Sequence, residues 1–119
     1  MMKHGPSFEL PTRGEVLIGR ARSSDIVLTD LTVSRRHAVL TVTPYGILVD
    51  DQGATSGTYV NNRLVRGGAP IRVGDVLRLG DLALTLVDDT QPGTRPRRWQ
   101  RLWAYLNQHR ASGRTNKGV

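Results

Sequence analysis

Short apolar runs, separated by turn-forming residues, dominate the first 89 positions of the chain. Apolar and polar residues alternate in several runs, as in 39–42 and 82–86, which is the pattern of a strand with one buried face. Glycine-containing pairs such as Gly74-Asp75 and Gly80-Asp81 separate the runs. The pattern predicts strands at 16–19, 26–28, 37–43, 46–51, 58–61, 76–79 and 82–87. Regularly spaced short strands without helical patterns between them predict an all-β fold, a sandwich of two antiparallel twisted sheets.

The period of the apolar residues changes near the C-terminus. Trp99, Leu102, Trp103 and Leu106 follow the spacing i, i+3, i+4 and i+7, which places them on one face of a helix. Arginines fall largely off that face. The spacing therefore predicts a basic amphipathic helix over 96–111, appended to the sandwich.

The charge is unevenly distributed along the 119 residues. The chain has 17 Lys and Arg against 10 Asp and Glu, a formal net charge of +7. Residues 1–89 are balanced, and residues 90–119 contain no acidic residue, so the excess lies in that C-terminal part. We predict a domain over 1–89, a linker over 90–95, the helix over 96–111 and a flexible tail over 112–119.

Composition excludes several classes of protein. The chain has no cysteine, which excludes disulfide scaffolds, thiol nucleophiles and thiolate metal sites. Its three histidines, His4, His37 and His109, are widely scattered, so we expect no metal and no cofactor. No window has the roughly 18 apolar residues of a membrane span, and residues 1–11 lack the apolar run of a secretory signal. We expect a cytoplasmic location.

The predicted loops carry a consistent set of anion donors. Arg20, then Ser34 and Arg35, then Thr55 and Ser56 each follow or precede an apolar run. Guanidinium groups, hydroxyls and the backbone N–H groups of a glycine-bearing loop donate hydrogen bonds to anions. No carboxylate is interleaved among them to act as a base or to bind a metal. A phosphate monoester, with its three acceptor oxygens, is the ligand that this combination favours.

These loops also resemble a known family. The pattern is Gly19-Arg20, Ser34-Arg35-x-His37, Asp51-x-Gly53-x-Thr55-x-Gly57-Thr58-x-Val60-Asn61 and then Gly74-Asp75. In this order and spacing the motifs, which span about residues 8–88, resemble the forkhead-associated (FHA) domain. That family reads phosphorylated motifs through basic clusters.

The resemblance implies a phosphothreonine-peptide site with distinct roles. The implied peptide-binding positions are Arg20 and Ser34 as principal phosphate ligands, with Arg35, Thr55, Ser56 and Asn61, and the resemblance also implies that Asn61 organises its loop. The implied loop-organising positions are Gly19, His37 and Gly57, and Thr32 lies in the loop that helps select the peptide sequence. The family's preference for phosphothreonine over phosphoserine implies a small apolar niche for the methyl group.

Three positions depart from the family pattern. Ser56 stands where the family usually has an asparagine that holds the peptide main chain, and Ala54 replaces a common serine. Asn62 replaces the usual glycine of a tight turn, a change that asparagine tolerates because it accepts positive φ. The Arg20 and Ser34 positions are intact.

We therefore expect a non-catalytic phosphothreonine-recognition module, an adaptor in Ser/Thr kinase signalling, whose partner is a phosphothreonine-containing protein. Catalysis is disfavoured because the chain has no Gly-x-Ser-x-Gly elbow. An alternative is an assembly protein whose sandwich is only a scaffold. In it, the helix containing Trp99, Leu102, Trp103 and Leu106 would bind a second protein, an anionic membrane or nucleic acid. The same helix could instead pack onto the sandwich or a neighbouring subunit.

Overall fold

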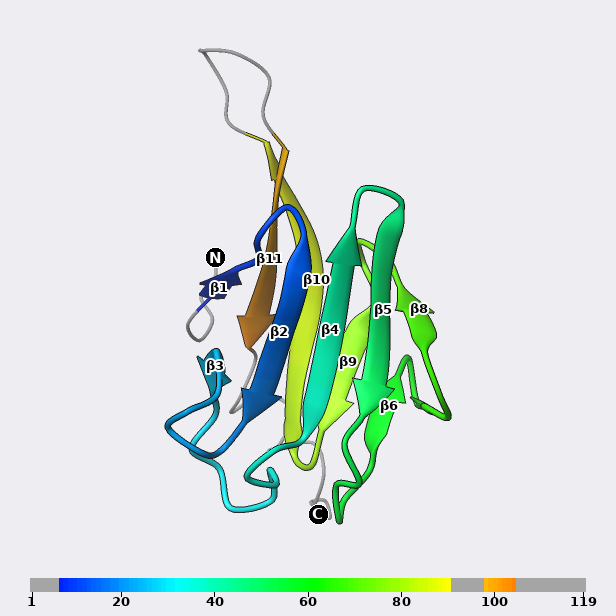
Figure 1. Ribbon diagram of the computed structural model, residues 1–119. Coiled ribbons are helices and arrows are strands. Elements are labelled where there is room, and N and C mark those ends of the chain that lie inside the picture. Colours follow the sequence, from blue (N-terminus) through cyan, green and yellow to red (C-terminus); the bar gives the residue numbers. More distant parts are fainter. Residues whose placement is uncertain (1–6, 91–97, 105–119) are drawn as a thin grey trace, which may run out of the picture.

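The computed structural model of the chain describes residues 7–90 and 98–104 (Figure 1). These residues form eleven strands. In chain order they are β1 (Ser7–Glu9), β2 (Gly14–Gly19), β3 (Ile26–Val27), β4 (Ala38–Thr43), β5 (Gly46–Asp51), β6 (Thr58–Val60), β7 (Arg63–Leu64), β8 (Ala69–Ile71), β9 (Val76–Leu79), β10 (Leu82–Thr90) and β11 (Arg98–Ala104).

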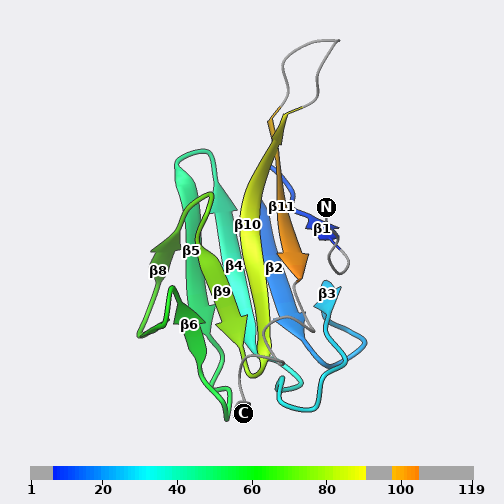
Figure 2. The ribbon, with the colours of Figure 1, turned by 180° about the vertical axis from the view of Figure 1, so that it is seen from behind.

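The strands form two sheets that pack face to face (Figures 1 and 2). One sheet has the order β1-β11-β10-β9-β6-β7, and the other has the order β3-β2-β4-β5-β8. Among the described residues every pair is antiparallel except β2 with β3, which is parallel. The predicted all-β sandwich is confirmed.

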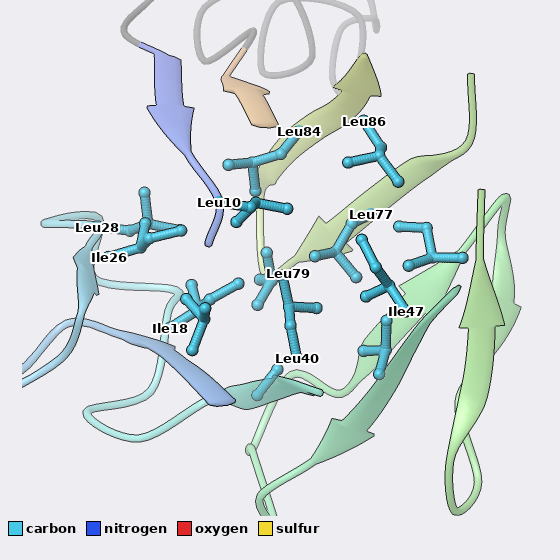
Figure 3. Packing of buried hydrophobic residues seen from close by; sticks show 14 of the residues in the cluster. Leu10, Ile18, Ile26, Leu28, Leu40, Ile47, Leu77, Leu79, Leu84 and Leu86 are labelled. Atoms are coloured by element: carbon cyan, nitrogen blue, oxygen red, sulfur yellow. The ribbon is translucent and has the colours of Figure 1, made fainter. Parts of the chain in front are cut away.

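Apolar side chains from both sheets fill the space between them (Figure 3). The alternation in β4 buries Ala38, Leu40 and Val42 and leaves the intervening residues at the outer face. Such alternation is expected where one face of a sheet is covered and the other meets water. Ile18 from β2 and Leu84 from β10 reach the same cluster from opposite sheets.

The segments that connect the strands gather the predicted site at one end of the sandwich. The β2–β3, β3–β4 and β5–β6 connections and the β9–β10 turn lie together at the lower end in Figure 1. The β4–β5 turn and the end of β10 at Thr90 lie at the opposite end. The polar motifs, although far apart in the sequence, therefore face a common region.

Residues 98–104, which were predicted to be part of the C-terminal helix, form a strand in the structure. These residues, which include Trp99, Leu102 and Trp103, form β11, paired in antiparallel register with β10 and with β1. The pairing satisfies backbone groups that would otherwise be open along β10, and tryptophan favours strands, so the sheet prevails over the helical spacing. The remainder of the predicted helix, 96–97 and 105–111 with Leu106, lies outside the described residues.

The predicted domain end at residue 89 lies one residue before the end of β10 at Thr90. Residues 91–95 of the predicted linker and the predicted tail, 112–119, lie outside the described residues. Across the described part of the chain, no helix has the length and apolar character needed to span a membrane.

Candidate functional site

Arg20 directly follows β2 and is fixed against the β3–β4 connection. Its backbone N–H donates to the Ser34 carbonyl oxygen at 2.9 Å, and its Nε–H donates to the Val33 carbonyl oxygen at 2.9 Å. Within the described residues no other hydrogen bond or ion pair involves the guanidinium. The two terminal nitrogens of Arg20 therefore have no partner within the described residues and can meet a ligand.

Gly19 permits this close approach. A Cβ at Gly19 would overlap the carbonyl oxygen of Arg35, so only glycine lets the end of β2 lie against the β3–β4 connection. The neighbouring Ala21 N–H donates to the same Arg35 oxygen at 3.1 Å. The predicted loop-organising role of Gly19 thus has a steric basis.

Ser34 joins the β3–β4 connection to the β5–β6 connection. Its Oγ accepts a hydrogen bond from the Thr55 N–H at 3.2 Å. The hydroxyl proton of Ser34 has no acceptor within the described residues. The hydroxyl can therefore donate its proton to an anion while its oxygen accepts from Thr55.

His37 holds the β3–β4 and β5–β6 connections together from the interior of the sandwich. The side chain is 0% exposed. Its Nδ1 accepts a hydrogen bond from the Ser34 N–H at 3.0 Å, and its Nε2 lies 2.8 Å from the Gly57 carbonyl oxygen. This pair of partners requires the neutral tautomer that carries its proton on Nε2. His37 is therefore a positioning residue and does not face the ligand region.

The β5–β6 connection has its own internal support. Asp51 Oδ2 accepts hydrogen bonds from the N–H groups of Gly53 at 2.8 Å and Ala54 at 3.1 Å. Its Oδ1 accepts one at 2.6 Å from the hydroxyl of Thr58, which is fully buried. Gly57 adopts a φ of 80°, which closes the turn at little steric cost. No role was predicted for Asp51 from the sequence, although Asp followed two residues later by Gly is a recognisable Asx-turn signal.

Thr32 joins the β3–β4 and β5–β6 connections and the β9–β10 turn through hydrogen bonds. Its Oγ1 donates to Asp30 Oδ1 at 2.6 Å and accepts from the Asp81 N–H at 2.8 Å. Its carbonyl oxygen accepts a hydrogen bond from the Ser56 hydroxyl at 3.0 Å. A Cβ at Gly80 would overlap that carbonyl oxygen. Thr32 therefore fixes the shape of the β3–β4 connection, and Ser56 uses its hydroxyl proton internally.

Asn61 is not brought to the other predicted site residues. It follows β6, at the end of that strand opposite Gly57, and its φ is 50°. Its side-chain amide donates to Asp75 Oδ1 at 3.0 Å, and its Oδ1 accepts from the Val76 N–H at 2.9 Å. With Leu64 it lines a separate pocket of about 710 Å³ beside β7. Asn61 organises a turn there, and its predicted place among the peptide-binding residues has no geometric support.

The Asn61 amide also affects the acidity of its partner. The pKa of Asp75 lies below its ordinary value of 3.8, because the Asn61 side chain and the Arg72 backbone N–H donate hydrogen bonds to the charged carboxylate. Burial opposes this shift, and the nearby Arg72 charge adds to it.

At the loop end of the sandwich, several donors among the predicted site residues have no partner within the described residues. They comprise the terminal nitrogens of Arg20, the Ser34 hydroxyl and the exposed side chains of Thr55 and Arg35. Over residues 7–90 and 98–104, no three His, Asp or Glu side chains lie close enough together to hold a metal ion. The site is equipped to bind an anion with several oxygen atoms.

Comparison with known proteins identifies the family. Residues 2–90 match the family model described as "Inner membrane component of T3SS, cytoplasmic domain", which is an FHA-type domain. The chain is 42% identical over 82 residues to the ABC transporter ATP-binding/permease protein Rv1747 of Mycobacterium tuberculosis, covering 69% of this chain and 9% of that protein. It is 41% identical over 71 residues to the FHA domain-containing protein FhaB of the same species, covering 60% of this chain and 46% of that protein.

Solved structures agree with these relatives. The FHA domain of the CT664 protein from Chlamydia trachomatis superposes with a TM-score of 0.66 at 28% identity, covering 69% of this chain and 83% of that chain. A structure from a study of phosphothreonine-dependent FHA domain interactions gives a TM-score of 0.56 at 27% identity, covering 80% of this chain and 79% of that chain. The chain spans less than half the length of the two curated relatives. By sequence, fold and loop motifs, the chain belongs to the forkhead-associated domain family, in the group that the T3SS cytoplasmic-domain model describes.

Proposed function

We propose that this chain is a non-catalytic module that binds phosphothreonine peptides and acts as an adaptor in Ser/Thr kinase signalling. The observation that carries the proposal is that Arg20 and Thr55 both lie against Ser34 or its neighbour Val33. Arg20 is hydrogen-bonded to the Val33–Ser34 backbone, and the Thr55 N–H is bonded to the Ser34 hydroxyl oxygen. Three donors from separate connections thereby share one small region.

The chemistry of this region suits a phosphate monoester. A phosphorylated side chain carries about −1.5 to −2 charge and three acceptor oxygens. The two terminal nitrogens of Arg20 can meet two of these oxygens, while the Ser34 and Thr55 hydroxyls serve the third. A hydrogen bond to a charged group contributes on the order of 1.5–3 kcal/mol, so loss of one weakens binding roughly tenfold to a hundredfold.

Phosphothreonine is the ligand we propose because related domains bind it. A related domain of known structure, 27% identical to this chain, takes part in phosphothreonine-dependent interactions. FhaB, which is 41% identical, carries the same type of domain. The partner we propose is therefore a protein phosphorylated on threonine, either a Ser/Thr kinase or one of its substrates. We also propose a cytoplasmic location, with which the absence of cysteine agrees.

A peptide titration tests the proposal. Matched peptides that differ only in phosphorylation of one threonine are titrated against the wild type, Arg20→Ala and Arg13→Ala. Arg13 is an exposed arginine that precedes β2, at the opposite end of the strand from Arg20, and serves as the charge-matched control. We expect phosphorylation-dependent binding that Arg20→Ala weakens at least tenfold and Arg13→Ala leaves intact. Equal affinities for the two peptides, or equal effects of the two variants, would contradict the proposal.

A further inference from the structure

A cleft lies at one side of the sandwich, where an edge strand of one sheet leads into an edge strand of the other. β7 ends one sheet and β8 ends the other, and the two follow each other in the chain. Figures 1 and 2 show β6 and β8 on this side and β1 and β3 on the opposite side. The cleft has a volume of about 710 Å³, and its wall includes Val60, Leu64, Ala69 and Pro70. We call it the edge cleft.

The apolar part of the edge cleft is the margin of the hydrophobic core. Val60 is paired with Leu77, and Ala69 is paired with Val49. Leu77 and Val49 are fully buried, and residues directly opposite each other lie on the same face of a sheet, so Val60 and Ala69 face the interior. Both are only partly buried although they pack against the core, and the buried Val65 also lines the cleft. An apolar group placed in the cleft would therefore extend the core.

Two arginines of the edge cleft have no partner on the protein. Arg63 is paired with Val60 and therefore lies on the inward face of β7. Arg66 follows β7 and also lines the cleft. Both side chains are exposed, and within the described part of the chain neither makes a hydrogen bond or an ion pair. Their guanidinium groups are therefore available to a ligand.

The acidic side chains nearby do not neutralise these arginines. Asp75 lines the cleft, but its two carboxylate oxygens accept hydrogen bonds from the Asn61 amide at 3.0 Å and from the Arg72 N–H at 2.8 Å. Asp50 lies outside the lining, beside Gly68, and pairs with neither arginine. Among the described residues, the charged groups of the cleft wall are thus two unpaired guanidinium groups and one carboxylate that is already hydrogen-bonded.

We propose that the edge cleft binds a small carboxylate with an aliphatic or aromatic body. The apolar body lies against Val60, Val65 and Ala69, and the carboxylate meets Arg63 and Arg66, whose planar guanidinium groups donate paired hydrogen bonds to carboxylates. The volume falls within the range of about 300–1,000 Å³ that is usual for small-molecule sites. This site is separate from the Arg20–Ser34 region, so the inference goes beyond the proposed function.

A homologous series of probes tests the proposal. Butanoate, hexanoate and octanoate carry the same charge and differ only in apolar length, acetate supplies the charge almost alone, and 1-octanol supplies the apolar chain alone. Each is titrated against the full chain and followed through the amide NMR resonances. Each methylene that becomes buried raises affinity about fourfold, so octanoate should bind up to about fifteenfold more tightly than hexanoate. The largest shifts should lie at Val65, Gly67 and Ala69.

Charge variants test the role of the two arginines. An exposed ion pair is weak, so octanoate should bind up to about fivefold more tightly than 1-octanol for each guanidinium contact. In Arg63→Ser/Arg66→Ser this preference should fall toward one, and in the control Arg13→Ser it should stay unchanged. Equal preferences in the two variants would show that these arginines do not hold the carboxylate.

Leucine variants test the apolar part of the cleft. Leu64 lines the edge cleft and Leu48 does not, yet their exposed fractions are nearly equal, at 45% and 44%. Leu64→Ser should weaken octanoate binding by at least about fourfold, the effect of one lost methylene contact. Leu48→Ser should leave it unchanged, and equal losses in the two would contradict the assigned place.

The remaining outcomes separate this site from other surfaces. Acetate binding as tightly as octanoate would reveal a surface that attracts any anion, and the proposal would be wrong. Shifts confined to Arg20, Ser34 and Thr55 would place the carboxylate in the phosphate region and would also overturn it. Saturating octanoate should leave phosphopeptide affinity unchanged, so failure of the carboxylate site leaves the proposed function standing, and the reverse also holds.

Discussion

Replacement of His37 removes the hydrogen bonds that join the β3–β4 and β5–β6 connections, which carry Ser34 and Thr55 of the proposed phosphate site. In His37→Leu, the Ser34 N–H loses its acceptor at 3.0 Å and the Gly57 carbonyl oxygen loses its partner at 2.8 Å. The cavity is fully enclosed, since the side chain is 0% exposed, and leucine fills it without a polar atom. Both backbone groups are then left without a partner on the protein.

The size of the effect follows from these two groups. A buried group left unsatisfied costs about 1–3 kcal/mol. Ser34 and Gly57 are only half-buried, so water replaces part of each lost bond, and we expect a decrease of about 2–4 kcal/mol in the free energy of unfolding. His37→Asn keeps an acceptor close to the position of Nδ1 but is too short to reach Gly57. The free energy of unfolding of His37→Asn should therefore decrease by about half as much as that of His37→Leu.

Urea unfolding and phosphopeptide titration of the same variants measure the two consequences. Stability should fall in the order wild type, His37→Asn, His37→Leu, and affinity should fall in parallel because Ser34 is no longer held against the β5–β6 connection. Ile47→Leu, a conservative core change within β5, should cost less than about 1.5 kcal/mol and leave affinity unchanged. A free energy of unfolding of His37→Leu within about 0.5 kcal/mol of wild type would contradict this role of His37.

Two further predictions concern glycine and carboxylate positions. Gly80→Ala should destabilise the protein by more than about 2 kcal/mol in thermal melts, because its Cβ would overlap the Thr32 carbonyl oxygen. Gly74→Ala, also at positive φ but in open space, should cost only about 1 kcal/mol, and equal losses in the two would refute the steric account. Asp75 has a lowered pKa when folded, so its contribution to stability is complete above its ordinary pKa of 3.8 and is lost as pH falls through the lower folded value. Asp75→Asn should therefore flatten the dependence of melting temperature on pH between 3.8 and the lower folded pKa. An unchanged dependence would show that the Asn61 hydrogen bond does not set it.

The sheets were predictable where a buried face imposes a period of two. The run 38–43 alternates clearly and forms β4, and 82–86 falls within β10. The strands Ser7–Glu9, Arg63–Leu64 and Ala69–Ile71 were missed because they are short and none has two adjacent hydrophobic residues, unlike the predicted run 26–28. Residues 98–104 were predicted as part of a helix, since a short run of tryptophan, leucine and arginine fits a helical spacing, but pairing with β10 determines the backbone.

The site was predictable at positions whose chemistry lies in a local motif. Arg20, Ser34 and Thr55 were assigned from motif order, and the structure brings them together. The contact of Thr32 with Asp81 joins residues 49 positions apart, and no local pattern encodes it. Asn61 was grouped with the site because it belongs to the same motif, but its partners are Asp75 in the β8–β9 turn and Val76 at the start of β9.

The separation between the sandwich interior and its loop end has a consequence for how such a domain acquires new targets. Arg20, Ser34 and Thr55 contribute no side chain to the apolar cluster that holds the two sheets together. A change at these positions therefore alters what is bound while the cooperative unit that unfolds stays nearly the same. Evolution, or an engineer building a reader for a different phosphorylated sequence, can work on a handful of exposed positions and leave the rest of the gene untouched.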